Sequence, residues 1–572
     1  MHKDKWRVLL FFDSLPEICG PRPCNMKGET TMKTAKRILA LLLALCMVFA
    51  IAACSSDKDT GTKDTGTTPG GDTTKPAGDT TEPTDGDAAQ SDAGSGEKDT
   101  TLTIGDVNAP NTFDVTGRQY AHWETMVFDT LVFSKPDGTI IPGIAKEWEY
   151  TDETTLVLHL RDDVFCTNGE QIKAPDCLWS LHFWATNTSQ ASGMQAYDFE
   201  NSYCEDDYTL VLKFNKPYGP GINAMVTYYM WNEEWATNAS GDDWWGAPNG
   251  SGPYKLVENV DGAYCSFELK DEYWGDMPEV TFVTYKYYSE PATMLIDLEN
   301  GDIDIAVDVQ ASDAERIMAN PDDYPALGWE KRELVDQMNL FLCDYVEYFQ
   351  DKNVREAVVL ALNNAEIATG MYGQLWVPAT SVMPAGIEYH VDVDIPQQNI
   401  ERAKELMAAS AWPNGFDLRL VVTTGQDLAA TVVQAQLAQI GINVNVETYD
   451  PGTAVPMMQK GEVDISLRVG MGGASFRDGA QGINDVFAYG STMRATMQDD
   501  PEFNEHYDGA LYTVDSEKRA ENYKWMQEWL IDEYHVYPIC ERCVFVAWDK
   551  AKVASCSSPI ASYISARWIE LA

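Results

Sequence analysis

The chain has 572 residues, of which 44% are hydrophobic and 11% aromatic, so it can bury a sizeable core and is long enough for two or three domains. Its formal net charge is -48, from 89 acidic and 41 basic residues, and repulsion from phosphate argues against a nucleic-acid-binding role. Only seven histidines are present, with no His-x3-His spacing and no paired Cys-x2-Cys motifs, so we predict no structural metal.

The first predicted element is an export signal. Three basic residues follow Met32, and an apolar run then covers residues 38–53, which is shorter than the ~20 residues that span a bilayer. We therefore predict a cleaved signal peptide over 32–53 rather than a transmembrane helix. Residues 1–31 place charges and prolines ahead of this signal, and we expect translation to begin at Met32.

The signal ends in Ile-Ala-Ala-Cys, which resembles the lipobox of bacterial lipoproteins. The resemblance implies that Cys54 is diacylated and becomes the mature amino terminus. Two acyl chains together give durable anchoring, so the protein is predicted to stay on the outer side of the cell membrane. Residues 55–100 consist almost entirely of small and polar types that cannot offset their ordering entropy, and they predict a disordered tether. A linker without functional consequence is the alternative.

Short β-branched segments follow the tether. Residues 102–105, 155–160 and 209–214 are apolar, bounded by turn-forming residues, and predict strands. Between residues 400 and 470 helices and strands alternate. The expected order is helix 400–411, strand 417–422, helix 427–440, strand 442–448, helix 455–460 and strand 463–468. Gly441 is placed to end the second helix. This alternation predicts right-handed βαβ units on a mainly parallel sheet, hence an α/β fold.

Several separated segments of residues 101–572 resemble the family 5 extracellular solute-binding proteins, which include oligopeptide, dipeptide and nickel binders. Their order and spacing carry the resemblance. The segments are 128–132, Asp137-Gly138, Pro142-Gly143-Ile144-Ala145, Trp148, 160–165, Asn168-Gly169, Ala174-Pro175-Asp176, Gly250-Ser251-Gly252-Pro253-Tyr254, Tyr273-Trp274-Gly275, 299–304, 354–357, Ala403-Lys404, 436–438 and 440–442.

The resemblance implies a two-lobed fold like that of the class II periplasmic binding proteins, with an extra subdomain and a ligand cleft between the lobes. The expected parts are lobe I at 101–145, 248–335 and 536–572, the subdomain at 146–247, and lobe II at 336–535. It further implies that the lobes close around the ligand by hinge rotation and that the closed form docks on an ABC permease. The partner ATPase supplies the energy, and no cofactor is expected.

Family resemblance also places ligand contacts after Phe113-Asp114. The predicted contacts there are Gly117, Arg118, Gln119 and Tyr120. A turn that merely exposes the arginine is the alternative.

The end of the last predicted strand departs from the family pattern. Peptide-binding relatives have a Trp there and, three residues later, an Asp that pairs with the ligand's α-amino group. This chain has Met471 and Ala474 instead. Met471 remains a predicted contact, and Asp478 is the nearest replacement carboxylate. Arg468 and Arg477 are alternatives that would hold a ligand carboxylate bidentately, unless both are solvated.

No enzyme motif accompanies these features. The chain has no Gly-x-Ser-x-Gly, His-Glu-x-x-His or P-loop sequence, and no thioredoxin-like pattern surrounds Cys540 and Cys543. Pairing of the eight cysteines after Cys54 is left open, free buried thiols being equally compatible. We predict a binding protein for peptides or peptide-like solutes. An oligosaccharide or metal-chelate binder, a secreted hydrolase and a transporter-independent sensor or chaperone remain as alternatives.

Overall fold

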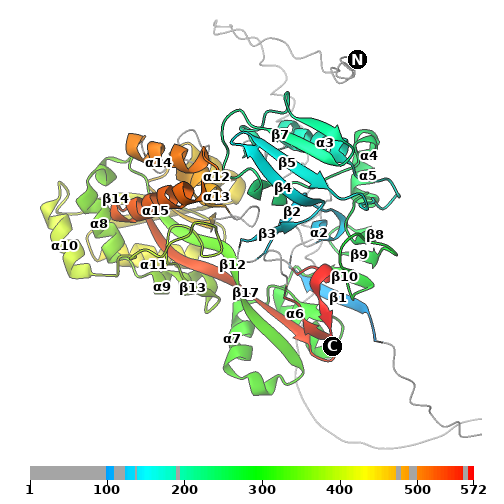
Figure 1. The fold of residues 1–572 in the computed structure, drawn as a ribbon. Coiled ribbons are helices and arrows are strands. Elements are labelled where there is room, and N and C mark those ends of the chain that lie inside the picture. Colours follow the sequence, from blue (N-terminus) through cyan, green and yellow to red (C-terminus); the bar gives the residue numbers. More distant parts are fainter. Residues whose placement is uncertain are drawn as a thin grey trace, which may run out of the picture. The chain divides into compact units, whose positions relative to one another are not determined.

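The computed structural model describes residues 98–107, 123–135, 138–188, 193–471, 478–487, 497, 499–557 and 564–572. Within them, eleven strands form one large mixed sheet and four strands form a separate antiparallel sheet (Figure 1). The large sheet has the strand order β15 (Asn443–Tyr449), β14 (Asp417–Thr423), β16 (Ile465–Met471), β12 (Leu327–Leu342), β17 (Val536–Asp549), β11 (Ile305–Ala306), β1 (Thr101–Asp106), β10 (Phe282–Tyr287), β9 (Tyr264–Leu269) and β8 (Tyr254–Val260), with β13 (Trp376–Pro378) paired to β17.

Two long strands, β12 and β17, run through both lobes. They pair antiparallel, and their register shifts between Glu333 and Gln337. On one side of the shift β17 pairs with β11, and on the other side β17 pairs with β13 while β12 pairs with β16. We call the part with β1 and β8–β11 the first lobe and the part with β13–β16 the second lobe. The fold is thus α/β and two-lobed, and the crossing of β12 and β17 joins the lobes.

The second lobe contains the predicted alternation of helices and strands. The helices are α10 (Ile400–Ala409), α11 (Asp427–Ala438) and α12 (Pro451–Gln459). β14 is parallel to β15 and to β16, as predicted, whereas β12 is antiparallel to β16, so the whole sheet is mixed. Helix α12 begins earlier than expected because the side chain of Asp450 caps it by accepting from the Thr453 amide. Gly441 follows α11 with φ +87°, a left-handed backbone that favours glycine.

The four-stranded sheet forms a subdomain. Its strand order is β4 (Ala145–Asp152), β5 (Thr155–Leu160), β7 (Thr209–Lys213) and β6 (Tyr203–Asp206). One face packs apolar side chains such as Leu158 and Leu210 into a core shared with α3 (Ala174–Asn187). The strands predicted at 155–160 and 209–214 are therefore confirmed. The exact domain boundaries remain a prediction.

The remaining elements cover the sheets. In the first lobe and subdomain they are α2 (Glu124–Val127), β2 (Val132–Ser134), β3 (Ile140–Pro142), 3-10 helix η3 (Asn223–Val226), α4 (Glu233–Asn238), α5 (Gly241–Gly246), α6 (Pro291–Asn300), α7 (Ala311–Ala319), η4 (Pro321–Asp323), β18 (Val553–Ser555), η6 (Ala566–Trp568) and β19 (Glu570–Leu571). In the second lobe they are η5 (Glu347–Gln350), α8 (Lys352–Ala361), α9 (Asn364–Tyr372), α13 (Gly479–Phe487), α14 (Pro501–Leu511) and α15 (Ser516–Asp532). Across the described ranges, every helix is too short or too polar to traverse a bilayer.

Candidate functional site

The predicted ligand contacts are described only in part. Gly117, Arg118, Gln119 and Tyr120 lie outside the described residues, as do Cys54 and residues 472–477 with Ala474 and Arg477. Met471 ends β16, and the structure describes its backbone alone. Arg468 and Asp478 are described with their side chains. They stand on either side of 472–477, so the site is built from these two residues.

Arg468 is a buried cation near the end of β16. Its side chain is 6% exposed, its guanidinium carbon lies 5.0 Å from the centre of the Phe341 ring, and its Nε donates to the Ser466 hydroxyl at 3.2 Å. Burial lowers the pKa of Arg468 below its ordinary value. A guanidinium remains charged even so, and in this setting it would bind an anionic group strongly.

A row of buried amides lies beside Arg468 on β12. Asn339 is the register partner of Arg468, and Gln337 stands two residues before it on the same face of the strand. Gln337 Nε2 donates to Asn339 Oδ1 at 2.8 Å and to the Ser381 carbonyl at 2.7 Å. Within the described ranges, Gln337 Oε1 and Asn339 Nδ2 have no hydrogen-bond partner. One acceptor and one donor are therefore unused next to the buried cation.

Glu541 extends this polar row onto β17. It is the register partner of Gln337, is 4% exposed, and accepts from the Ala385 amide at 3.0 Å. Burial raises the pKa of Glu541. The row lies where β12 and β17 pass from one lobe to the other, and sequence reasoning missed it. Polar residues at alternate positions 337 and 339, directly before the apolar run 340–342, were the available signal.

Asp478 immediately precedes α13 and is fully buried. Its Oδ1 accepts from the Ala480 amide at 2.8 Å and from Arg519 Nη2 at 2.6 Å. Its Oδ2 accepts from the same Arg519 nitrogen at 2.8 Å and from Asn223 Nδ2 at 3.1 Å. A carboxylate offers about four acceptor positions, so all of them are filled here. Its role as an anchor for a ligand amine stays a prediction, and it requires a ligand to displace one of these donors.

Arg519, on α15, completes the ion pair and was not a sequence candidate. Its side chain is 4% exposed, and its Nε donates to the Ala510 carbonyl at 3.1 Å. Although burial alone would lower the pKa of Arg519, the Asp478 carboxylate raises it above the ordinary value. The arginine thus holds Asp478 in place at the end of the segment predicted to contact ligand.

A second carboxylate lies close by. Glu388 Oε2 accepts from Asn223 Nδ2 at 2.6 Å, so this single amide nitrogen bridges Glu388 and Asp478. Burial and the neighbouring charge of Asp478 raise the pKa of Glu388. Asn223 belongs to the subdomain, whereas both carboxylates belong to the second lobe.

Comparison with known proteins identifies the family. Residues 139–488 match the family described as "Bacterial extracellular solute-binding proteins, family 5 Middle". The chain belongs to this family. It is therefore a solute-binding protein and not an enzyme, and the two-lobed fold agrees with the assignment.

Individual relatives are distant. The nickel-binding periplasmic protein of Escherichia coli (strain K12) is 24% identical over 346 residues, which cover 56% of this chain and 66% of that protein. The oligopeptide-binding protein AppA of Bacillus subtilis (strain 168) is 22% identical over 475 residues, covering 76% and 80%. The solved structure of DppA from Helicobacter pylori in complex with peptide STSA superimposes with a TM-score of 0.70 at 19% identity, covering 83% and 98%. This structural likeness shows the shared fold.

The cysteines of this solute-binding protein that the structure describes are free thiols. Cys540 and Cys543 are both buried, and their spacing on β17 points their side chains to opposite faces of the sheet. Cys540 packs in the core of the second lobe, whereas Cys543 packs with α6 and α7. Burial raises the pKa of the Cys543 thiol to about 11. Their positions disfavour a redox pair.

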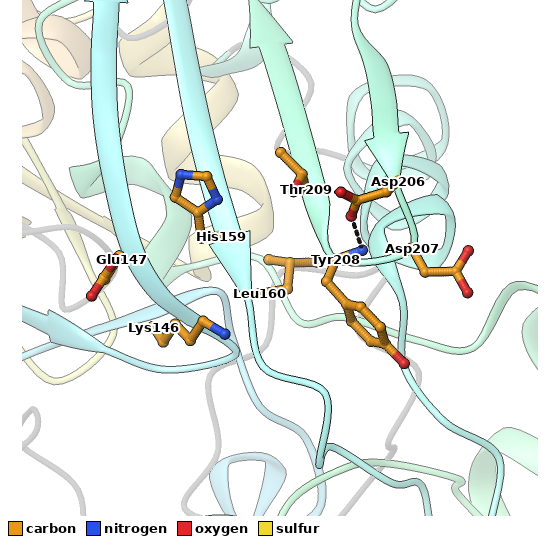
Figure 2. A pocket seen from close by; sticks show the side chains of 8 residues that line it. All are labelled: Lys146, Glu147, His159, Leu160, Asp206, Asp207, Tyr208 and Thr209. Carbon is orange, nitrogen blue, oxygen red and sulfur yellow. Dashed lines mark hydrogen bonds between the residues drawn. The ribbon is translucent and has the colours of Figure 1, made fainter.

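The solute-binding protein also has an open cavity of about 740 Å³ on the four-stranded sheet (Figure 2). Charged groups of both signs line it, including Lys146, Glu147 and Asp206, together with the imidazole of His159. The Asp206 carboxylate is already used by the Tyr208 amide at 2.8 Å. Among the residues with described positions, no His, Cys, Asp or Glu cluster suited to a metal ion is found. This cavity contains none of the predicted ligand contacts.

Proposed function

We propose that the protein is the lipid-anchored, extracytoplasmic receptor of an ABC importer and captures peptides or peptide-like solutes for the permease. One observation carries the ligand class. The match to an oligopeptide-binding protein extends along 80% of that relative, whereas the match to the nickel-binding protein extends along 66%. We take the longer match to favour a peptide ligand.

The chemistry around Arg468 supports a ligand with a carboxylate. A peptide carries one at its C-terminus, and a guanidinium can hold it through two parallel hydrogen bonds. The unused Gln337 Oε1 and Asn339 Nδ2 can serve the peptide's own amide groups. Such pairing offsets the cost of removing these polar groups from water.

A metal chelate is the second candidate. The nickel-binding relative favours it. The hydrogen bonds of Asp478 favour it too, because its acceptor positions are all filled and none is left for a ligand amine. Ala474 supplies no carboxylate for an ammonium group. A chelate brings carboxylates for Arg468 and needs no amine anchor.

A thermal-shift screen separates the candidates. The probes are a tripeptide pool, the same pool N-acetylated, nickel and iron chelates of citrate, and malto-oligosaccharides. Ligand at 100 times Kd stabilises a binding protein by about 2.7 kcal/mol, a rise in Tm of several degrees. We expect the tripeptides to raise Tm. If only the chelates do so, the second candidate replaces the first.

A variant pair tests the role of Arg468. Arg468→Gln is expected to abolish the shift caused by a positive probe. Arg402→Gln is the control, because Arg402 lies on the exposed face of α10 and is half-exposed. An unchanged shift in folded Arg468→Gln protein would rule Arg468 out as the anion anchor.

A further inference from the structure

Residues 216–223 connect the subdomain to the second lobe at a place distant in sequence from the strand crossing. The Gly219 amide donates to the Leu511 carbonyl at 2.9 Å, and Lys216 Nζ lies 3.0 Å from the centre of the Tyr512 ring. Both partners lie at the C-terminal end of α14. Asn223 adds its bridge to Glu388 and Asp478.

The approach of the two backbones here requires glycine. A Cβ on Gly219 would collide with the guanidinium of Arg519 and would lie 2.6 Å from the Thr513 carbonyl oxygen. Arg519 is thus enclosed by Gly219 on one side and held by Asp478 on the other. Any separation of the subdomain from α14 and α15 would break contacts to the same ion pair.

The subdomain is tied more extensively to the first lobe. The Thr167 amide donates to the Gly250 carbonyl at 3.0 Å, Met230 donates to Asp129 at 3.0 Å, and the Asn168 amide donates to Asn249 Oδ1 at 3.0 Å. A rotation about the crossing of β12 and β17 would carry the subdomain with the first lobe. The contacts of 216–223 with the second lobe would then open.

We infer that residues 216–223 form a closure latch, in which Asn223 bridges Glu388 and Asp478 and thereby links the lobe equilibrium to the Asp478–Arg519 ion pair. The amide is matched to this position because it is neutral and donates to two carboxylates. Without it, the partly buried Glu388 carboxylate loses its amide donor beside Asp478, which is paired with Arg519. The cost of keeping this carboxylate partly buried without its donor would then favour separation of the lobes, which exposes it to water.

The latch rests on the two-lobed architecture and not on the class of ligand. Asn223 is a positioning residue, since it acts through Asp478 and Arg519. A ligand that prefers the closed form gains apparent affinity from a closed population already present. Weakening the latch therefore reduces affinity for every ligand by one common factor.

Spin-label distance measurements on the ligand-free protein test the inference. Labels at Glu149→Cys on the subdomain and Glu517→Cys on α15 occupy exposed positions, while seven of the eight described native cysteines are buried. Asn223→Ala removes the amide that bridges Glu388 and Asp478. Gly219→Ala adds a methyl group where Arg519 and the Thr513 carbonyl leave no room. We expect Asn223→Ala, which loses hydrogen bonds to two carboxylates, to raise the ratio of long-distance to short-distance populations at least tenfold. Gly219→Ala should raise this ratio as well, because its methyl group collides with Arg519 and the Thr513 carbonyl oxygen.

Matched controls separate the latch from general damage. Gly241→Ala adds the same methyl group in the subdomain where no atom lies within 4 Å, and Asn201→Ala removes an exposed amide bonded within the subdomain. Both should keep the wild-type distances. Lys216→Ala is a third latch variant, which removes the contact with Tyr512 by changing an exposed side chain. It replaces Asn223→Ala or Gly219→Ala if either fails to fold. Wild-type distances in every folded latch variant would overturn the inference, whatever ligand the thermal-shift screen finds.

Discussion

Replacing Asp478 by Asn tests the central ion pair of the site. In the variant the Arg519 guanidinium keeps its charge, is 4% exposed, and loses its carboxylate. Leaving one partner of a buried pair uncompensated costs about 3–5 kcal/mol. We expect the free energy of unfolding to fall by that amount, because an amide oxygen replaces only part of the lost attraction.

Urea unfolding at neutral pH measures this loss. The matched control is Asp163→Asn, which breaks an Arg–Asp pair whose side chains are 29% and 52% exposed, and an exposed pair contributes about 0–1 kcal/mol. Arg519→Met combined with Asp478→Asn removes both charges and should recover part of the stability. A loss below about 1 kcal/mol for Asp478→Asn would refute the reasoning from burial.

The same variant, compared with N-acetylation of the ligand, tests whether Asp478 also anchors a ligand amine, because only the acetylation leaves the latch intact. A hydrogen bond to a charged group contributes ~1.5–3 kcal/mol, so loss of the anchor should weaken peptide binding at least tenfold. N-acetylation of the peptide should weaken binding to the wild-type protein equally. Calorimetry with free and acetylated forms gives the answer. Equal affinities for both forms would reject recognition of the amino terminus and favour the chelate candidate.

Three further predictions concern other parts of the chain. Cys54→Ala should release the protein into the medium, and retention in the membrane fraction would refute the anchor. Replacing Cys540 and Cys543 together by Ser should leave ligand affinity and uptake nearly unchanged, because neither thiol reaches the other; loss of uptake by the folded variant would count against this. Burial lowers the pKa of His535 from 6.5 to about 3, although Asp344 lies 3.8 Å away. The unfolded state takes up a proton on this ring below pH 6.5, whereas the folded state does not until about pH 3. The free energy of unfolding therefore falls as pH drops from 6.5 toward 3, by about 3 kcal/mol at pH 4. In His535→Gln the urea midpoint should fall less over this pH range than in the wild-type protein.

Local patterns in the sequence predicted several elements correctly. β14, α11 and β15 each follow from a periodicity confined to fewer than fifteen residues, and Gly441 marks its turn through a backbone conformation that other residues rarely adopt. The two-lobed architecture, by contrast, was predicted from the family resemblance and not from local patterns. The start of α12 at Pro451 was missed because its cap, Asp450, lies in a stretch without apolar periodicity.

The family, the alternating helices and strands between residues 400 and 470, and the interest of Arg468 and Asp478 could be inferred from the amino-acid sequence. The contacts of those two residues depend on long-range packing. Arg519 is 41 residues from Asp478 and Asn223 is 255 residues away, so no local period links them. The shift between Glu333 and Gln337 likewise depends on pairing strands separated by about two hundred residues. Such contacts arise from the global packing of the sheet and its covering helices, which short-range propensity does not encode.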